Sequence, residues 1–69
     1  MTMAQKIKMA LAYAGLSEAE LARRLDMSPQ ALHQRIKTGK FTVAELESIA
    51  QAVGARYTFG FTFEDGTTV

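Results

Sequence analysis

The sequence predicts a mainly α-helical fold of four helices, followed by a C-terminal β-hairpin. Apolar residues recur with helical spacing as far as Gly54, and beyond it the spacing changes to every second residue. The third observation is length, because 69 residues leave room for only one small hydrophobic core. A chain of this size buries only about 60% of its unfolded surface. We therefore expect residues 1–69 to form one domain that depends on close helix packing or on a partner subunit.

The first and fourth helices are predicted over about residues 2–14 and 43–53. Gly15 is placed to end the first helix, and Thr42 with Glu45 forms a capping box that starts the fourth. The apolar residues of the first helix share one face and are Met3, Ile7, Ala10, Leu11 and Ala14. Those of the fourth are Leu46, Ile49, Ala50 and Val53. Both helices are therefore amphipathic and should pack against the other two.

The second and third helices are predicted over about residues 17–25 and 29–37. Ser17 and Glu20 have the spacing of a capping box, and Ser28 caps the third helix with Pro29 at its first position. Gly39 can adopt the positive φ that ends such a helix. The inward residues of the second helix are Leu21, Ala22 and Leu25. Two short helices joined by a tight corner are thus expected.

The third helix has two different faces. At about 100° per residue, one face carries Ala31, Leu32 and Ile36, which we expect to point inward. The opposite face carries amides, an imidazole and an ammonium but no carboxylate, and its residues are Gln30, His33, Gln34 and Lys37. Such groups suit base edges in a major groove, where phosphates would repel carboxylates. Any solvated helix also has a polar face, so this stripe alone fits either interpretation.

The two-helix unit resembles the helix-turn-helix of phage repressors and Cro proteins. Bacterial regulators of the xenobiotic-response-element type share this motif. The resemblance extends over residues 5–54, and it is carried by AELA at 19–22, Leu25, SPQAL at 28–32 and TGK at 38–40. It implies a repressor-like DNA-binding domain, with small Ala22 where the two helices cross. It also implies that the third helix lies in the major groove and that its N-terminal residues meet base edges.

Two residues depart from the family pattern. Asp26 occupies a corner position that usually holds glycine, so we expect it to adopt a left-handed or bridging conformation. Arg35 stands where the family usually has an apolar residue, and its guanidinium must leave the core by pairing with a carboxylate. Glu20 is the first expected partner, and Glu45 or Glu47 the next.

The charge distribution agrees with a nucleic-acid surface. The chain has a net charge of only +1, but residues 23–40 hold five basic residues against one acidic residue, whereas residues 41–69 hold one against four. The candidate base-reading residues are Gln30, His33 and Gln34. The candidate backbone contacts are Arg23, Ser28, Lys37 and Lys40. We expect sequence-specific binding of double-stranded DNA by a homodimeric transcriptional regulator, a repressor.

Aromatic residues alternate with small residues after Gly54. This pattern predicts a strand over about 56–63, a turn at Glu64-Asp65-Gly66 and a short return strand over 67–69. The longer strand has an edge without a partner in the chain, so we expect it to form the homodimer interface. The interface residues would be Tyr57, Phe59, Phe61 and Phe63. The alternative is that these aromatic residues cover the core of their own monomer.

Two other functions stay open. The aromatic strand could make the chain a protein-interaction module, as an antitoxin or a phage inhibitor is. Alternatively, Tyr57, Phe59 and Phe61 could stack on the bases of single-stranded RNA, although they lie in the acidic part of the chain.

Catalysis, metal binding and membrane insertion have no support in the sequence. One histidine and no cysteine do not build a zinc finger, and no nucleophile has a neighbouring base and acid. We therefore expect no enzyme, no metal, no cofactor and no small-molecule site. The absence of cysteine suits a cytoplasmic protein, and no apolar run is long enough for a membrane span.

Overall fold

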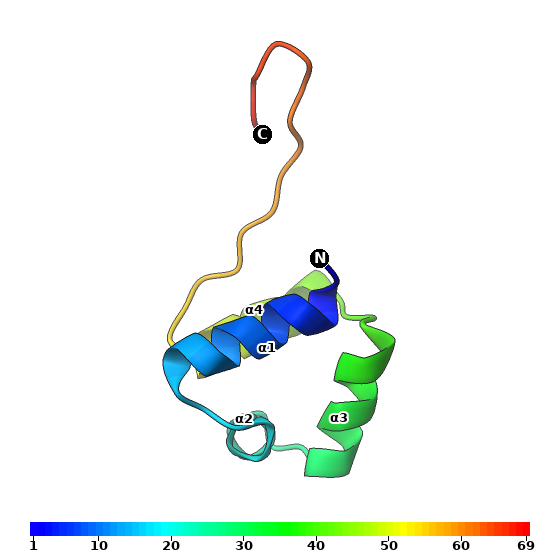
Figure 1. Cartoon of the computed structure of the whole chain (residues 1–69), viewed down its shortest axis with the longest axis vertical. Coiled ribbons are helices and arrows are strands. Elements are labelled where there is room, and N and C mark those ends of the chain that lie inside the picture. Colours follow the sequence, from blue (N-terminus) through cyan, green and yellow to red (C-terminus); the bar gives the residue numbers. More distant parts are fainter.

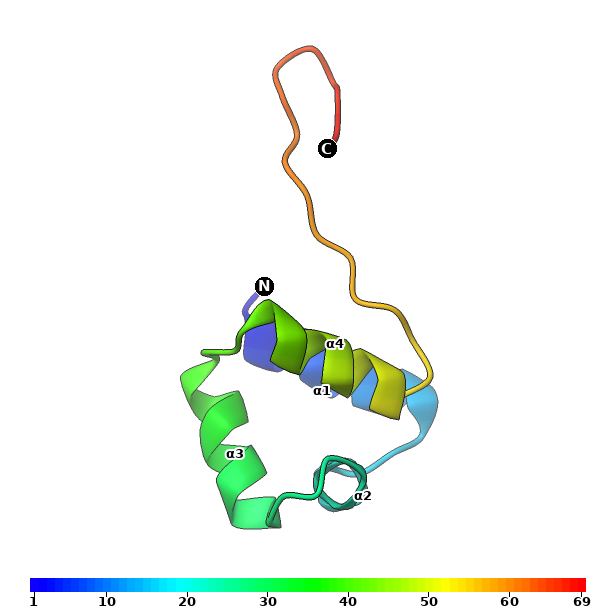
Figure 2. The same ribbon diagram turned by 180° about the vertical axis from the view of Figure 1, so that it is seen from behind.

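The computed structural model describes all residues 1–69 and contains four helices. They are α1 (Met3–Ala14), α2 (Glu18–Arg24), α3 (Pro29–Thr38) and α4 (Val43–Ala52), as Figure 1 shows. The prediction of a small α-helical fold with four helices is confirmed. The helices form a bundle, and residues 56–69 leave it as an extended segment, which we call the arm (Figure 2). The arm gives the molecule its longest dimension of 44 Å.

Local hydrogen bonds explain where each helix begins. The hydroxyl groups of the four N-cap residues each accept a backbone N–H at 3.1 Å, and these residues are Thr2, Ser17, Ser28 and Thr42. Thr42 and Glu45 form the predicted capping box. The box predicted for Ser17 and Glu20 forms only in part, since Ser17 accepts the Glu20 N–H but the Glu20 carboxylate does not return the bond. That carboxylate is engaged by Arg23 and Arg24.

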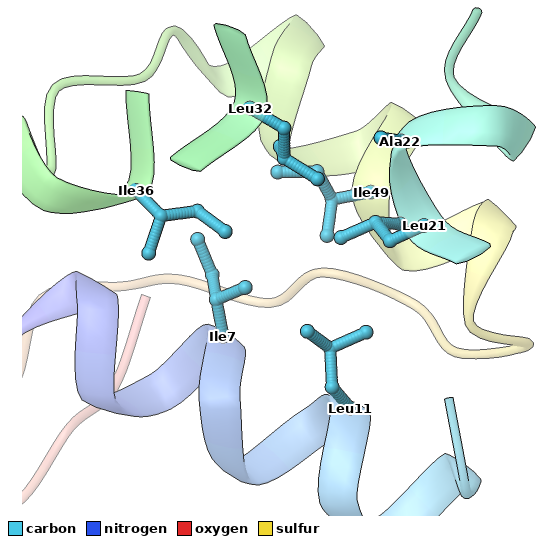
Figure 3. Packing of buried hydrophobic residues seen from close by; sticks show 7 residues of the cluster. All are labelled: Ile7, Leu11, Leu21, Ala22, Leu32, Ile36 and Ile49. Carbon is cyan, nitrogen blue, oxygen red and sulfur yellow. The ribbon is translucent and has the colours of Figure 1, made fainter. Parts of the chain in front are cut away.

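The core lies where all four helices meet (Figure 3). Its seven buried residues are Ile7, Leu11, Leu21, Ala22, Leu32, Ile36 and Ile49. Ala31 was predicted to point inward, but it is exposed. The reason is geometric, because Leu32 and Ile36 fix the rotation of α3 and leave Ala31 about 120° from their mean direction. Arg35 deviates by only about 80° and is the half-buried residue instead.

The corner between α2 and α3 depends on Asp26. Its φ is 58°, so the predicted left-handed conformation is confirmed, and it is the one non-glycine residue with a positive φ. The next residue, Met27, then donates its N–H to the Ala22 carbonyl at 2.8 Å. This bond closes the end of α2 and directs the chain into α3.

Arg35 joins the end of α3 to the start of α4. Its Nη2 atom lies 2.6 Å from the Glu45 carboxylate and donates to the Lys40 carbonyl at 3.1 Å. Its guanidinium carbon also lies 5.2 Å from the centre of the Phe41 ring. Glu20, the first expected partner, is wrong, because Glu20 lies on α2 and is taken by two other arginines. Glu45, from the second choice, is the observed partner.

The arm contains a turn and one β-bridge but no strand. Thr62 and Thr68 form the bridge, and Phe61 and Val69 exchange two backbone hydrogen bonds. The Asp65 carboxylate accepts the Thr67 N–H at 2.9 Å in the turn between them. Residues 56–60 make no backbone hydrogen bond, since 67–69 are too few to reach them. The hairpin with a strand over 56–63 therefore stays a prediction.

The aromatic residues of the arm do not cover the core of the monomer. Phe59 and Phe61 are each 71% exposed and Phe63 is 58% exposed, so that alternative is wrong for all three. Tyr57 is half-buried and lines a groove together with residues of α1 and α4, such as Ala10 and Leu46.

The contacts of Arg35 generate a stability prediction. Replacing Arg35 by alanine should lower the midpoint of thermal unfolding more than Gln34→Ala, because the Gln34 side chain is exposed and forms no hydrogen bond. In a domain of this size each kcal/mol lost lowers the midpoint by about 4–8 °C. The ion pair with Glu45 is partly exposed, so added salt should remove part of the difference while the Phe41 contact remains. Calorimetry at two salt concentrations measures both effects, and equal midpoints for the two variants would contradict this role.

Candidate nucleic-acid interface

The outer face of α3 is exposed as predicted from its spacing. Gln30, His33, Gln34 and Lys37 all face solvent, and the opposite side of the helix buries Leu32 and Ile36. The helix contains no acidic residue. The structure thus gathers the three candidate base-reading side chains on one face, where Glu18 and Pro29 complete the rim of a depression.

Glu18 belongs to this face although the sequence did not predict it there. Its Oε1 atom lies 3.3 Å from Nδ1 of His33 and therefore links the first turn of α2 to the outer face of α3. The sequence places no carboxylate one turn away from His33 on its own helix. A contact between residues 15 positions apart depends on how α2 and α3 pack, and no local pattern signals it.

Arg23 projects outward but is not free. Its guanidinium forms two hydrogen bonds with the Glu20 carboxylate, and its side chain is still 71% exposed. These bonds from Arg23, with a weaker one from Arg24, lower the pKa of Glu20 from 4.5 to about 2. The same partner raises the pKa of Arg23. Arg24 also donates to the Ala52 carbonyl at 2.8 Å and so ties α2 to the end of α4.

The other candidate contacts with the DNA backbone are Ser28, Lys37 and Lys40, and they differ in which polar groups remain unpaired. The Ser28 oxygen accepts the Ala31 N–H as the cap of α3, which leaves its O–H available as a donor. Lys37 and Lys40 are exposed, and neither forms an ion pair. Both lie at the C-terminal end of α3 or just beyond it.

Ion pairs reduce the unpaired positive charge that residues 23–40 present on the surface. Arg23, Arg24 and Arg35 are each paired with a glutamate, so three of the five basic residues within 23–40 are neutralised locally. The two lysines at the end of α3 carry the unpaired charge. Anion contacts are therefore expected beside the C-terminal half of the exposed stripe.

The candidate interface residues of the arm form two groups. The rings of Tyr57 and Phe59 stack on each other, with their centres 6.0 Å apart and their planes 21° from parallel. Phe61 and Phe63 lie further out, beside the turn, and are exposed. The structure thus leaves the three phenylalanines uncovered within one chain.

Comparison of the chain with family models, with curated proteins and with solved structures finds no match. No cluster of three or more His, Cys, Asp or Glu side chains is arranged to hold a metal ion. None of the helices combines the length and the apolar character that crossing a membrane requires. The exposed face of α3 and the arm are therefore the features from which we infer a function.

Proposed function

We propose that the chain binds double-stranded DNA in a sequence-specific manner and acts as a homodimeric transcriptional regulator, a repressor. In this proposal α3 lies in the major groove. The observation that carries it is the outer face of α3, which is exposed and polar and has no carboxylate of its own, while Leu32 and Ile36 on the inner face are buried. The resemblance of residues 5–54 to repressor and Cro helix-turn-helix proteins supports the same docking.

The chemistry of the stripe supports direct reading of bases. A glutamine amide can donate to and accept from adenine in the major groove at the same time. Gln30 and Gln34 are one helical turn apart, about 6 Å along α3, so they can reach different base pairs. His33 lies between them on the same face.

The unpaired lysines support contact with the DNA backbone. Lys37 and Lys40 follow the base-reading residues at the end of α3, where phosphates would flank the groove. In this arrangement Arg23 and Ser28 are the backbone contacts contributed by α2 and by the cap of α3. Such contacts position the protein on the duplex without reading its sequence.

Base reading and backbone contact can be separated by two substitutions. Gln34→Ala should cost about 1–3 kcal/mol at one base-pair position and relax the preference there. Lys40→Ala should weaken binding to all duplexes alike and reduce the salt dependence by about one phosphate contact. Titration of fluorescent duplexes at several salt concentrations measures both effects. If both substitutions lower affinity for every duplex by the same factor, Gln34 does not read a base.

We infer that the arm forms the homodimer. Residues 56–60 present unpaired backbone N–H and C=O groups, and the neighbouring phenylalanines are exposed. Pairing with the same segment of a second copy would satisfy these groups and cover the aromatic rings about a two-fold axis. Such an axis would place both α3 helices on one side, about 34 Å apart, as two successive major grooves require.

Two substitutions in the arm test the homodimer. Phe59→Ser combined with Phe61→Ser should convert a dimer into a monomer and leave helix content unchanged, because neither ring belongs to the core. Sedimentation at micromolar concentration measures the state, and Tyr13→Ser is the matched control, since Tyr13 is 97% exposed on α1. An arm variant that still dimerises, or a monomeric wild-type chain, would contradict the inference.

The exposed phenylalanines also favour a second candidate function, a protein-interaction module. In that case the helices would serve as a scaffold for the arm, and another protein would cover the rings. Retention of the wild-type chain on random duplex DNA separates the two functions, because DNA binding weakens steeply as salt is raised. Retention that does not respond to salt would favour the module.

A further inference from the structure

We propose that Glu18 decides which base His33 reads, because it fixes the position of the imidazole proton. This inference depends on the proposed DNA binding and adds a positioning residue to it. Glu18 itself need not touch the bases, since it acts through the histidine ring.

The geometry assigns a direction to each nitrogen of the ring. Glu18 Oε1 lies 3.3 Å from His33 Nδ1, and an ionised carboxylate only accepts hydrogen bonds. The contact therefore requires the proton on Nδ1. The Glu18 side chain is 32% exposed and that of His33 is 62% exposed, so the carboxylate is the more sheltered member of the pair.

The outer nitrogen then has a defined role. In the neutral ring Nε2 is an acceptor, and it can pair with the amino groups of adenine or cytosine in the major groove. A neutral ring with its proton on Nε2 would instead donate, to acceptors such as those of guanine. By holding the proton on Nδ1, Glu18 thus favours adenine or cytosine over guanine.

Few other charges act on the ring. On α2, Glu18 is the one residue within ion-pair distance of the His33 ring. The other carboxylate of this helix, Glu20, is paired with Arg23 and Arg24. On α3, Lys37 follows one turn later and forms no ion pair. Removing the Glu18 charge also changes the attraction to phosphates of any sequence, so the informative quantity is base preference and not overall affinity.

The first experiment uses the free protein. Nitrogen chemical shifts of the imidazole at about pH 8, where a histidine is ordinarily neutral, should place the proton of His33 on Nδ1. In Glu18→Ala it should move toward Nε2. Glu47→Ala is the matched control, because Glu47 is an exposed carboxylate without an ion pair. The same proton position in wild type and Glu18→Ala would overturn the proposal.

The second experiment measures preference at the base pair that His33 reads, which is found as the position where His33→Ala loses discrimination. At about pH 8 the wild type and Glu47→Ala should favour adenine or cytosine over guanine by about tenfold. Glu18→Ala should bind all duplexes more tightly, since a negative charge near phosphates is gone, but should lose this preference.

The outcomes separate this proposal from the proposed function. If the wild type binds duplexes and Glu18→Ala keeps the wild-type preference, the role of Glu18 is wrong while DNA binding stands. If the wild type binds no duplex, the proposed function fails and this inference fails with it, whatever the nitrogen shifts show.

Discussion

The crossing of α2 over α3 is the contact on which the rest of the structure depends. Leu21 and Ala22 of α2 and Leu32 of α3 are fully buried, and Figure 3 shows them in the core together with Ile49. Burying a leucine side chain stabilises a fold by about 1.5–3 kcal/mol, and a larger residue in a filled position costs about 1–3 kcal/mol. Ala22 is fully buried, so extra volume at this position would displace its neighbours in the core. Its small size therefore helps to set how closely the helices pack.

Polar contacts then fix α3 at two places along its length. Arg35 holds the C-terminal end to the start of α4, and Glu18 meets His33 on the outer face near α2. Glu20 neutralises Arg23 and Arg24, and Glu45 neutralises Arg35, so the unpaired charge of residues 23–40 is concentrated at Lys37 and Lys40. Within α3, Arg35 thus serves the fold, whereas the exposed stripe keeps its amides and Lys37 unpaired.

Residue patterns within a few positions predicted much of the fold. Most of the predictions that were wrong concern contacts between residues far apart in the sequence. The helix caps follow from side-chain chemistry within a few residues and are observed, although the Ser17–Glu20 box forms only in part. Asp26 adopts the left-handed one of the two conformations that the resemblance implied. The exposure of Ala31, the pairing of Arg35 with Glu45 instead of Glu20, and the contact of Glu18 with His33 depend on helix rotation and packing, which the sequence does not display. A strand over 56–63 needs a partner that 67–69 are too short to supply, so the period-two pattern could not show whether the strand forms within one chain. Function is still a proposal, because composition and spacing define a polar face without naming its ligand.

The central claim is that the outer face of α3 reads DNA as one half of a two-fold pair. Selection of bound duplexes from a random pool tests it most directly, since it assumes no target. The account predicts an enriched sequence with two-fold symmetry, whose half-sites lie about 10 base pairs apart from centre to centre. A pool without any enriched sequence after repeated selection, or an enriched sequence that lacks this symmetry, would contradict it.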